Sequence, residues 1–181
     1  ELTYQPMREL LDYLRANGFK TYIVSGGGVE FLRAMSQELY GIPPEQVIGT
    51  AGGTKYGYGK DGKPFLTKEP KLLLNDNNAG KPEGIHLMIG RRPLMSVGNS
   101  TGDQQMLEYA AAGDGARLAM LVLHDDEKRE YAYGPAQGLR QLVAERVEPG
   151  HLGPCLGVLL LLLGQGLLGP LDRRGGAGEV L

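Results

Sequence analysis

The sequence predicts an α/β protein with a parallel β-sheet flanked by helices. Short apolar runs alternate with amphipathic segments along most of the 181 residues. Several of the apolar runs end in small or polar residues, at Ser25, at residues 98–103 and at His124. Because open parallel sheets bind ligands at the carboxyl ends of their strands, these three places are the first candidates for a site.

The N-terminal part begins with a helix, a strand and a second helix. Apolar residues recur at helical spacing over residues 3–17, and Pro6 falls in the first turn, where its missing N–H costs nothing. Residues 20–26 form an apolar run typical of a buried strand. The next helical pattern covers residues 29–40 and ends at Gly41.

The segment that follows is rich in glycine and lysine. A short strand is expected at residues 46–50, and a β-hairpin insertion at 51–67 turning around Asp61-Gly62. Residues 71–80 have a loop-like composition.

Three further helices and two strands are predicted downstream. A helix should begin at Pro82 and end near Ile89, since proline suits the first helical position. The remaining expected elements are a strand at 94–98, a helix at 102–112, a strand at 117–123 and a helix at 125–133.

The last part of the chain differs in composition. Residues 140–181 are dominated by Leu, Gly and Pro, and no charged residue occurs from Leu152 to Leu171. Such a stretch is just long enough to span a bilayer, but glycine and proline interrupt it. We therefore predict a domain at residues 1–139 and a low-complexity tail at 140–181 that is non-native or disordered, with a membrane anchor at 152–171 as the alternative.

Composition excludes several classes of protein. The net charge of −2 gives no electrostatic basis for binding nucleic acid. The single cysteine, Cys155, excludes a disulfide framework and a cysteine-rich zinc site. The three histidines form no pair at ligand spacing.

Ser25 precedes Gly26, Gly27 and Gly28 at the start of a helix. A phosphate at this point could interact with the hydroxyl, the backbone N–H groups and the helix dipole together. The stretch matches neither a dinucleotide fingerprint, a Walker loop nor a nucleophile elbow. Taken alone, it is equally a glycine-rich turn with a capping serine.

Lys81 lies at the beginning of the helix expected from Pro82. A lysine near a helix N-terminus is unfavourable unless an anion lies between its ammonium group and the helix amides. The alternative is an ordinary solvated lysine on the surface.

Asn99 and Asp103 bracket a turn of small residues after the strand at 94–98. An amide oxygen and a carboxylate that converge at a strand end suit a hard cation such as Mg²⁺. The same residues equally suit a helix start, with Ser100 or Thr101 as its cap and Asp103 in favourable contact with the dipole.

In this order, the motifs resemble those of the haloacid dehalogenase (HAD) superfamily of phosphohydrolases, closest to its phosphoserine-phosphatase-like branch. "YIVSGG", "GKPEGI" and "VGNSTGDQQM" are similar to its second, third and fourth motifs over roughly residues 3–135. The resemblance implies that Ser25 and Lys81 are catalytic residues, and that the hairpin at 51–67 lies near the entrance of the site. It also implies that Ser25, Gly26, Gly27 and Lys81 bind the substrate phosphate, and that Asn99 and Asp103 hold Mg²⁺.

The family's first motif, Asp-x-Asp, does not occur in this sequence. In the family its first aspartate is the nucleophile that forms an aspartyl-phosphate, at the end of a central strand followed by a cap. The resemblance therefore implies a HAD-like Rossmannoid sheet without that strand and the main cap. It also implies a full-length Mg²⁺-dependent phosphate monoester hydrolase for small-molecule phosphoesters, and we expect the 181-residue chain itself to be inactive. The alternatives are a non-catalytic phosphate-binding module and a membrane-tethered protein.

Overall fold

The computed structural model describes residues 3–122, 158–161 and 179–180, which form a mixed α/β fold. In chain order the elements are α1 (Gln5–Ala16), β1 (Lys20–Thr21), β2 (Ile23–Gly28), α2 (Val29–Tyr40), β3 (Val47–Tyr58), β4 (Pro64–Leu74), α3 (Gly80–Ile89), β5 (Met95–Gly98), α4 (Gln104–Ala111), β6 (Leu118–Val122), β7 (Val158–Leu161) and β8 (Glu179–Val180). Short 3-10 turns precede β3 and α4, at Pro44–Gln46 and Thr101–Asp103.

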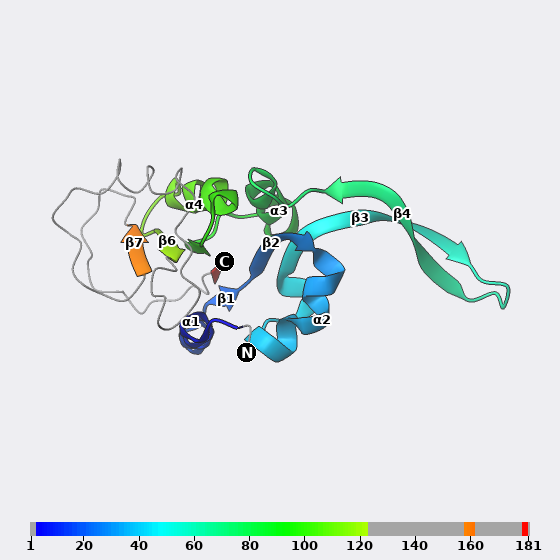
Figure 1. Ribbon diagram of the computed structural model, residues 1–181, viewed down its shortest axis with the longest axis horizontal. Coiled ribbons are helices and arrows are strands. Elements are labelled where there is room, and N and C mark those ends of the chain that lie inside the picture. The colour runs from blue at the N-terminus through cyan, green and yellow to red at the C-terminus, as the bar shows by residue number, and fades with distance from the viewer. Residues whose placement is uncertain (1–2, 123–157, 162–178, 181) are drawn as a thin grey trace.

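The strands form two sheets that meet at β1 and β2 (Figure 1). One sheet has the order β1-β8-β5-β6-β7, and all of its pairs are parallel except β6 with β7. The other has the order β2-β3-β4, with β2 parallel to β3 and β3 antiparallel to β4. Since only Tyr22 separates β1 from β2, the two sheets lie along one nearly continuous strand.

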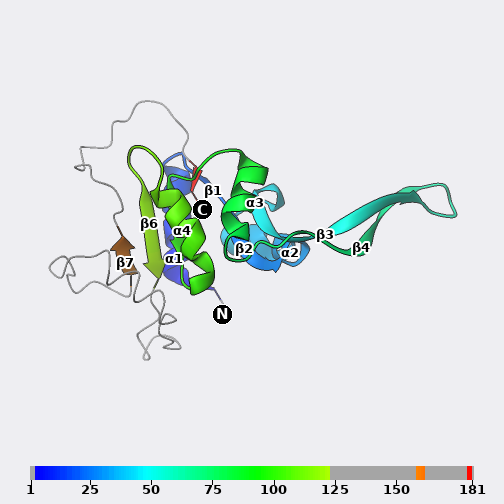
Figure 2. The ribbon, with the colours of Figure 1, turned by 90° about the horizontal axis from the view of Figure 1, so that it is seen from above.

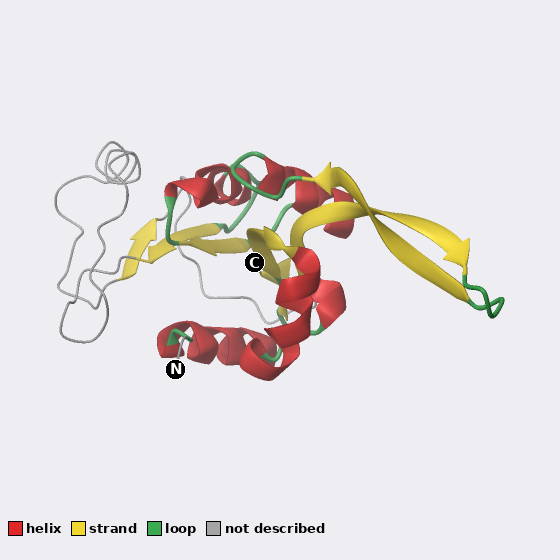
Figure 3. Cartoon of the chain, turned by 45° about the vertical axis from the view of Figure 1, so that its right-hand side comes forward, coloured by secondary structure: helices red, strands yellow, loops and turns green. Residues whose placement is uncertain are grey.

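Helices cover both faces of the sheets (Figure 3). On one face, Leu14 of α1 packs with Met95 and Met120 of the sheet. On the other face, Ile85 of α3 and Met106 of α4 pack against Tyr22 and Ile48. The sheet region is therefore buried between two apolar layers, as the alternating pattern predicts.

Most predicted elements are present with shifted ends. The helix expected at 29–40 has these bounds, and Gly41 ends it with a φ of 65°, in the left-handed region that favours glycine. The helix expected from Pro82 begins two residues earlier, at Gly80, because Gly80 and Lys81 complete its first turn. The helix expected at 125–133 lies outside the described residues, as does His124.

The hairpin is present but larger than predicted. The expected loop at 71–80 is wrong in its first part, because residues 71–74 complete β4, and their partners Ala51 and Gly52 lie in β3. Beyond the body of the molecule, β3 and β4 form a two-stranded ribbon that projects away from the helices (Figures 1 and 2). Its distal part, around the turn 59–63, does not lie beside the candidate site, so the expected position near the site entrance is wrong for that part.

The tail contributes β7 and β8. The rest of residues 140–181 lies outside the described residues, and its predicted non-native or disordered character stays a prediction. Within the described residues, no helix is long and apolar enough to cross a bilayer.

Candidate functional site

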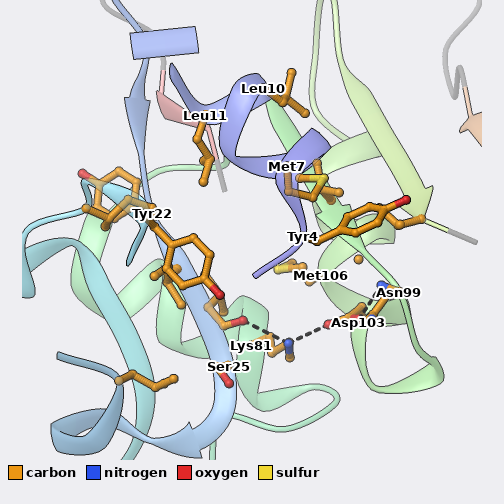
Figure 4. Close-up of a pocket in the computed structure, with 18 of the residues that line it drawn as sticks. Tyr4, Met7, Leu10, Leu11, Tyr22, Ser25, Lys81, Asn99, Asp103 and Met106 are labelled. Carbon is orange, nitrogen blue, oxygen red and sulfur yellow. Dashed lines mark hydrogen bonds and ion pairs between the residues drawn. The ribbon is translucent and has the colours of Figure 1, made fainter. Parts of the chain in front are cut away.

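A cavity of about 570 Å³ opens where β2 and β5 approach their carboxyl ends (Figure 4). Its wall contains Ser25, Lys81, Asn99 and Asp103, which come from β2, α3 and the segment after β5. Apolar side chains of α1 line the opposite wall. The fold therefore brings four of the predicted site residues to one cavity, although they lie far apart in the sequence.

Lys81 is buried at the base of this cavity, with 7% of the residue exposed. Its Nζ donates to Asp103 Oδ1 at 2.6 Å and to the carbonyl oxygen of Val24 at 3.1 Å. The alternative of a solvated surface lysine is therefore wrong. A lysine side chain is seldom buried without a partner, and here one carboxylate and one backbone carbonyl compensate its charge.

Asp103 connects Lys81 to the turn after β5. Its Oδ2 accepts hydrogen bonds from the backbone N–H of Asn99 at 2.9 Å, from the backbone N–H of Ser100 at 3.0 Å and from the Ser100 hydroxyl at 3.1 Å. Burial would raise the pKa of Asp103, but the hydrogen bond and charge of Lys81, together with the two N–H groups, hold it below its usual value. Asp103 thus stays ionised at neutral pH.

The donors around Asp103 do not by themselves fit a magnesium site. Asp103 already accepts four hydrogen bonds, which include the capping box formed with Ser100. Asn99 is exposed, and the described residues contain no group of three or more acidic, histidine or cysteine side chains that could hold a metal ion. We therefore derive no step through a metal, and the Mg²⁺ assignment to Asn99 and Asp103 stays a prediction.

Ser25 is half-buried in the cavity wall, and the three glycines after it are exposed. β2 continues through Gly28, so the glycines extend a strand and lead directly into α2. The Ser25 hydroxyl accepts a hydrogen bond from the N–H of Gly27 at 3.1 Å, and it does not cap α2. The Gly26 carbonyl accepts the Thr50 hydroxyl at 2.8 Å, which ties the segment to β3.

One further buried carboxyl group near Lys81, that of Asp76, was not predicted from the sequence. The residue has no exposed surface, and neither of its carboxyl oxygens has a hydrogen-bond partner within bonding distance among the described residues. Burial raises the pKa of Asp76 to about 7, although the charge of Lys81 and the nearby backbone N–H of Ser25, which does not reach hydrogen-bond geometry, oppose this shift. Asp76 was missed because "NDNN" has a loop composition; an acidic residue just before a lysine-bearing helix start was the available signal.

No protein-family model and no curated protein matches this chain. The assignment of a function therefore depends on the geometry of the cavity and on the resemblance in the motifs.

Proposed function

We propose that this chain provides the phosphoryl-binding part of a phosphate monoester hydrolase of the HAD type. The observation that carries the proposal is the buried ammonium group of Lys81, held by Asp103 and Val24 in the same cavity wall as Ser25. Two of the three N–H donors of Lys81 are used in these contacts, and the third is available to an oxygen of a phosphate.

The chemistry proposed for the site is charge stabilisation. A phosphoryl group in transfer spreads negative charge over its equatorial oxygens, and a fixed ammonium in a site that excludes water stabilises that charge strongly. The Ser25 hydroxyl and the N–H group of Gly26 would add neutral donors, whereas the N–H group of Gly27 would first have to leave Ser25 Oγ. The attacking carboxylate is implied only by the resemblance, and no Asp-x-Asp is present to supply it.

Phosphate binding tests the proposal. Titration of the chain with inorganic phosphate, followed by ³¹P NMR line width, should show saturable broadening. Lys81→Met should weaken this binding at least tenfold, whereas Lys68→Met should leave it unchanged, because Lys68 is an exposed lysine on the ribbon. Equal phosphate binding by the folded Lys81→Met variant and the wild type would overturn the proposal.

A turnover assay tests whether the chain itself hydrolyses phosphate monoesters. We expect no hydrolysis of p-nitrophenyl phosphate by the purified chain, because it lacks a nucleophile in the family's position. Turnover that Lys81→Ala abolishes would show that this expectation of inactivity is wrong.

The second candidate is a non-catalytic phosphate-binding module. The pairing of β8 between β1 and β5 favours it, since it closes part of the sheet without any further strand. This candidate predicts cooperative thermal unfolding of the chain alone, whereas a fragment with an incomplete sheet should unfold over a broad range of temperature.

A further inference from the structure

The ribbon of β3 and β4 carries an exposed apolar face beyond the body of the molecule (Figures 1 and 2). Tyr56 of β3 lies opposite Leu66 of β4, and Tyr58 lies opposite Pro64. Opposed residues of an antiparallel pair lie on the same face, and so do residues two apart in one strand. These four exposed side chains therefore form one surface, which we call the tyrosine face.

The same ribbon concentrates the lysines of the chain. Five of the eight lysines lie at residues 55–71, together with only two acidic residues, so this stretch has a net charge of +3 whereas the whole chain has −2. Because the remainder of the chain is acidic, its electrostatic field orients the ribbon toward a negatively charged surface. Three of these lysines form no ion pair within the described residues: Lys55, Lys60 and Lys71.

The outer edge of β4 does not favour pairing with a further strand. Among the described strands, β4 pairs only with β3, so this edge is open. However, Pro64 and Pro70 interrupt its row of N–H groups, and Lys68 and Lys71 add charge along it. Proline and lysine on an open edge are the features by which proteins prevent strand addition. A partner is therefore expected to contact the tyrosine face rather than to extend the sheet.

The side chains of the ribbon distinguish between partners of negative charge. Lysine is depleted in protein–protein interfaces, whereas tyrosine is enriched at the membrane–water interface and basic segments are attracted to anionic lipids. Single-stranded nucleic acid stacks its bases on aromatic ring faces. Here Tyr56 and Tyr58 meet edge to face, with an interplanar angle of 85°, and the opposed Leu66 and Pro64 are aliphatic. This arrangement favours a lipid surface over a nucleic acid.

We propose that the ribbon binds the surface of a lipid bilayer with anionic headgroups, with the tyrosine face in the interfacial layer. The side chains of this face leave water, while Lys60 and Lys63 at the turn stay with the headgroups. Unpaired N–H and C=O groups along the edges keep the ribbon at the interface, because they need water. The proposal concerns the ribbon and not residues 152–171, and it does not depend on phosphate hydrolysis.

Co-sedimentation of the full chain with phosphatidylcholine–phosphatidylserine vesicles tests the proposal. We expect saturable binding that weakens as salt is added and is at least tenfold weaker on pure phosphatidylcholine. Lys60→Gln with Lys63→Gln should weaken binding at least fivefold, since one basic residue near an anionic surface contributes about fivefold. The control, Lys20→Gln with Arg91→Gln, removes the same charge from exposed positions of the body and should change binding less than twofold.

A second pair of variants tests the tyrosine face. Leu66→Ser shortens a side chain of this face, and Leu87→Ser makes the same change on α3, where the exposed fraction is 68% compared with 66% at Leu66. Leu66→Ser should weaken vesicle binding at least threefold, and Leu87→Ser less than twofold. No saturable binding to the anionic vesicles, equal binding to pure phosphatidylcholine, or equal affinities of a folded ribbon variant and its control would each overturn the proposal. Tighter binding of a single-stranded oligonucleotide, lost in the same ribbon variants, would also overturn it.

Discussion

Lys81 lies near two buried carboxyl groups that differ in ionisation. Asp103 is held charged by a direct ion pair and two backbone N–H groups, whereas Asp76 has no hydrogen bond to its oxygens among the described residues and a pKa raised to about 7. Near neutral pH the three side chains therefore carry a net charge between zero and minus one. The net charge around Lys81 therefore changes over the range in which Asp76 titrates.

Replacement of Asp76 by Asn should remove a dependence of stability on pH. The folded-state pKa of about 7 lies above the ordinary 3.8, so the folded protein binds more protons than the unfolded chain between these values. Stability should therefore fall as pH rises from about 4 to 7. At pH 8 Asp76→Asn should raise the free energy of unfolding by up to about 4 kcal/mol, at about 1.4 kcal/mol per pKa unit.

Urea unfolding at pH 4 and pH 8 measures this effect. At pH 4 the variant and the wild type should differ little, because the carboxyl group is then protonated in the folded state and only partly ionised in the unfolded chain. Asp114→Asn, at an exposed position, is the control, and its difference in stability from the wild type should be the same at the two pH values. An equal gain for Asp76→Asn at both pH values would contradict the assignment of the shift to burial.

Loss of both partners of the Lys81–Asp103 pair should lower the free energy of unfolding by less than the sum of the two single losses. Lys81→Met leaves a buried carboxylate without its cation, which costs about 3–5 kcal/mol in comparable pairs. Lys81→Met with Asp103→Asn removes both charges, and its cost should be smaller than the sum of the two single substitutions. Urea unfolding of the four proteins gives the coupling energy, and simple additivity would contradict the pairing.

The elements that local signals specify were the ones that the sequence predicted well. Gly41 places one helix end correctly, and Pro6 lies in the first turn of α1 as predicted, although this helix begins at Gln5 rather than at residue 3. β4 was predicted too short because residues 71–74 continue a strand only through pairing with β3. The inward position of Lys81 was also not predictable, because it depends on the contact of α3 with Val24 and Asp103.

The contact between α3 and β3 depends on the absence of a side chain at Gly84. A Cβ atom there would lie 2.5 Å from Asp76 Oδ1 and 2.9 Å from Ile48 Cγ2. We expect Gly84→Ala to lower the free energy of unfolding by about 1–3 kcal/mol, as overpacked cores do. Thermal unfolding checks this, with Glu83→Ala, an exposed position of the same helix, as a control that should change stability little.

For the whole molecule, the sequence predicted the fold class but not the arrangement of the sheet. Alternating apolar and amphipathic runs suffice for a mixed α/β fold, which is what forms. The position of β8 between β1 and β5 could not be foreseen, because Glu179 and Val180 carry no strand pattern of their own and pair with residues at the other end of the chain. The sequence predicted that one site contains Ser25, Lys81, Asn99 and Asp103, and these four residues line one cavity. It did not predict the buried carboxyl group of Asp76.

The ribbon of β3 and β4 will exchange its amide hydrogens on a different timescale from the body. Side chains on its distal part are largely exposed, among them Tyr58 at 67% and Leu66 at 66%, so little burial opposes its local opening. In a deuterium-exchange experiment at neutral pH, residues 54–68 should take up label at least tenfold faster than β5 and β6. In the described part of the chain, the ribbon and the body should therefore open independently, and a ligand bound at the ribbon tip should protect the ribbon amides without changing the protection of β5 and β6.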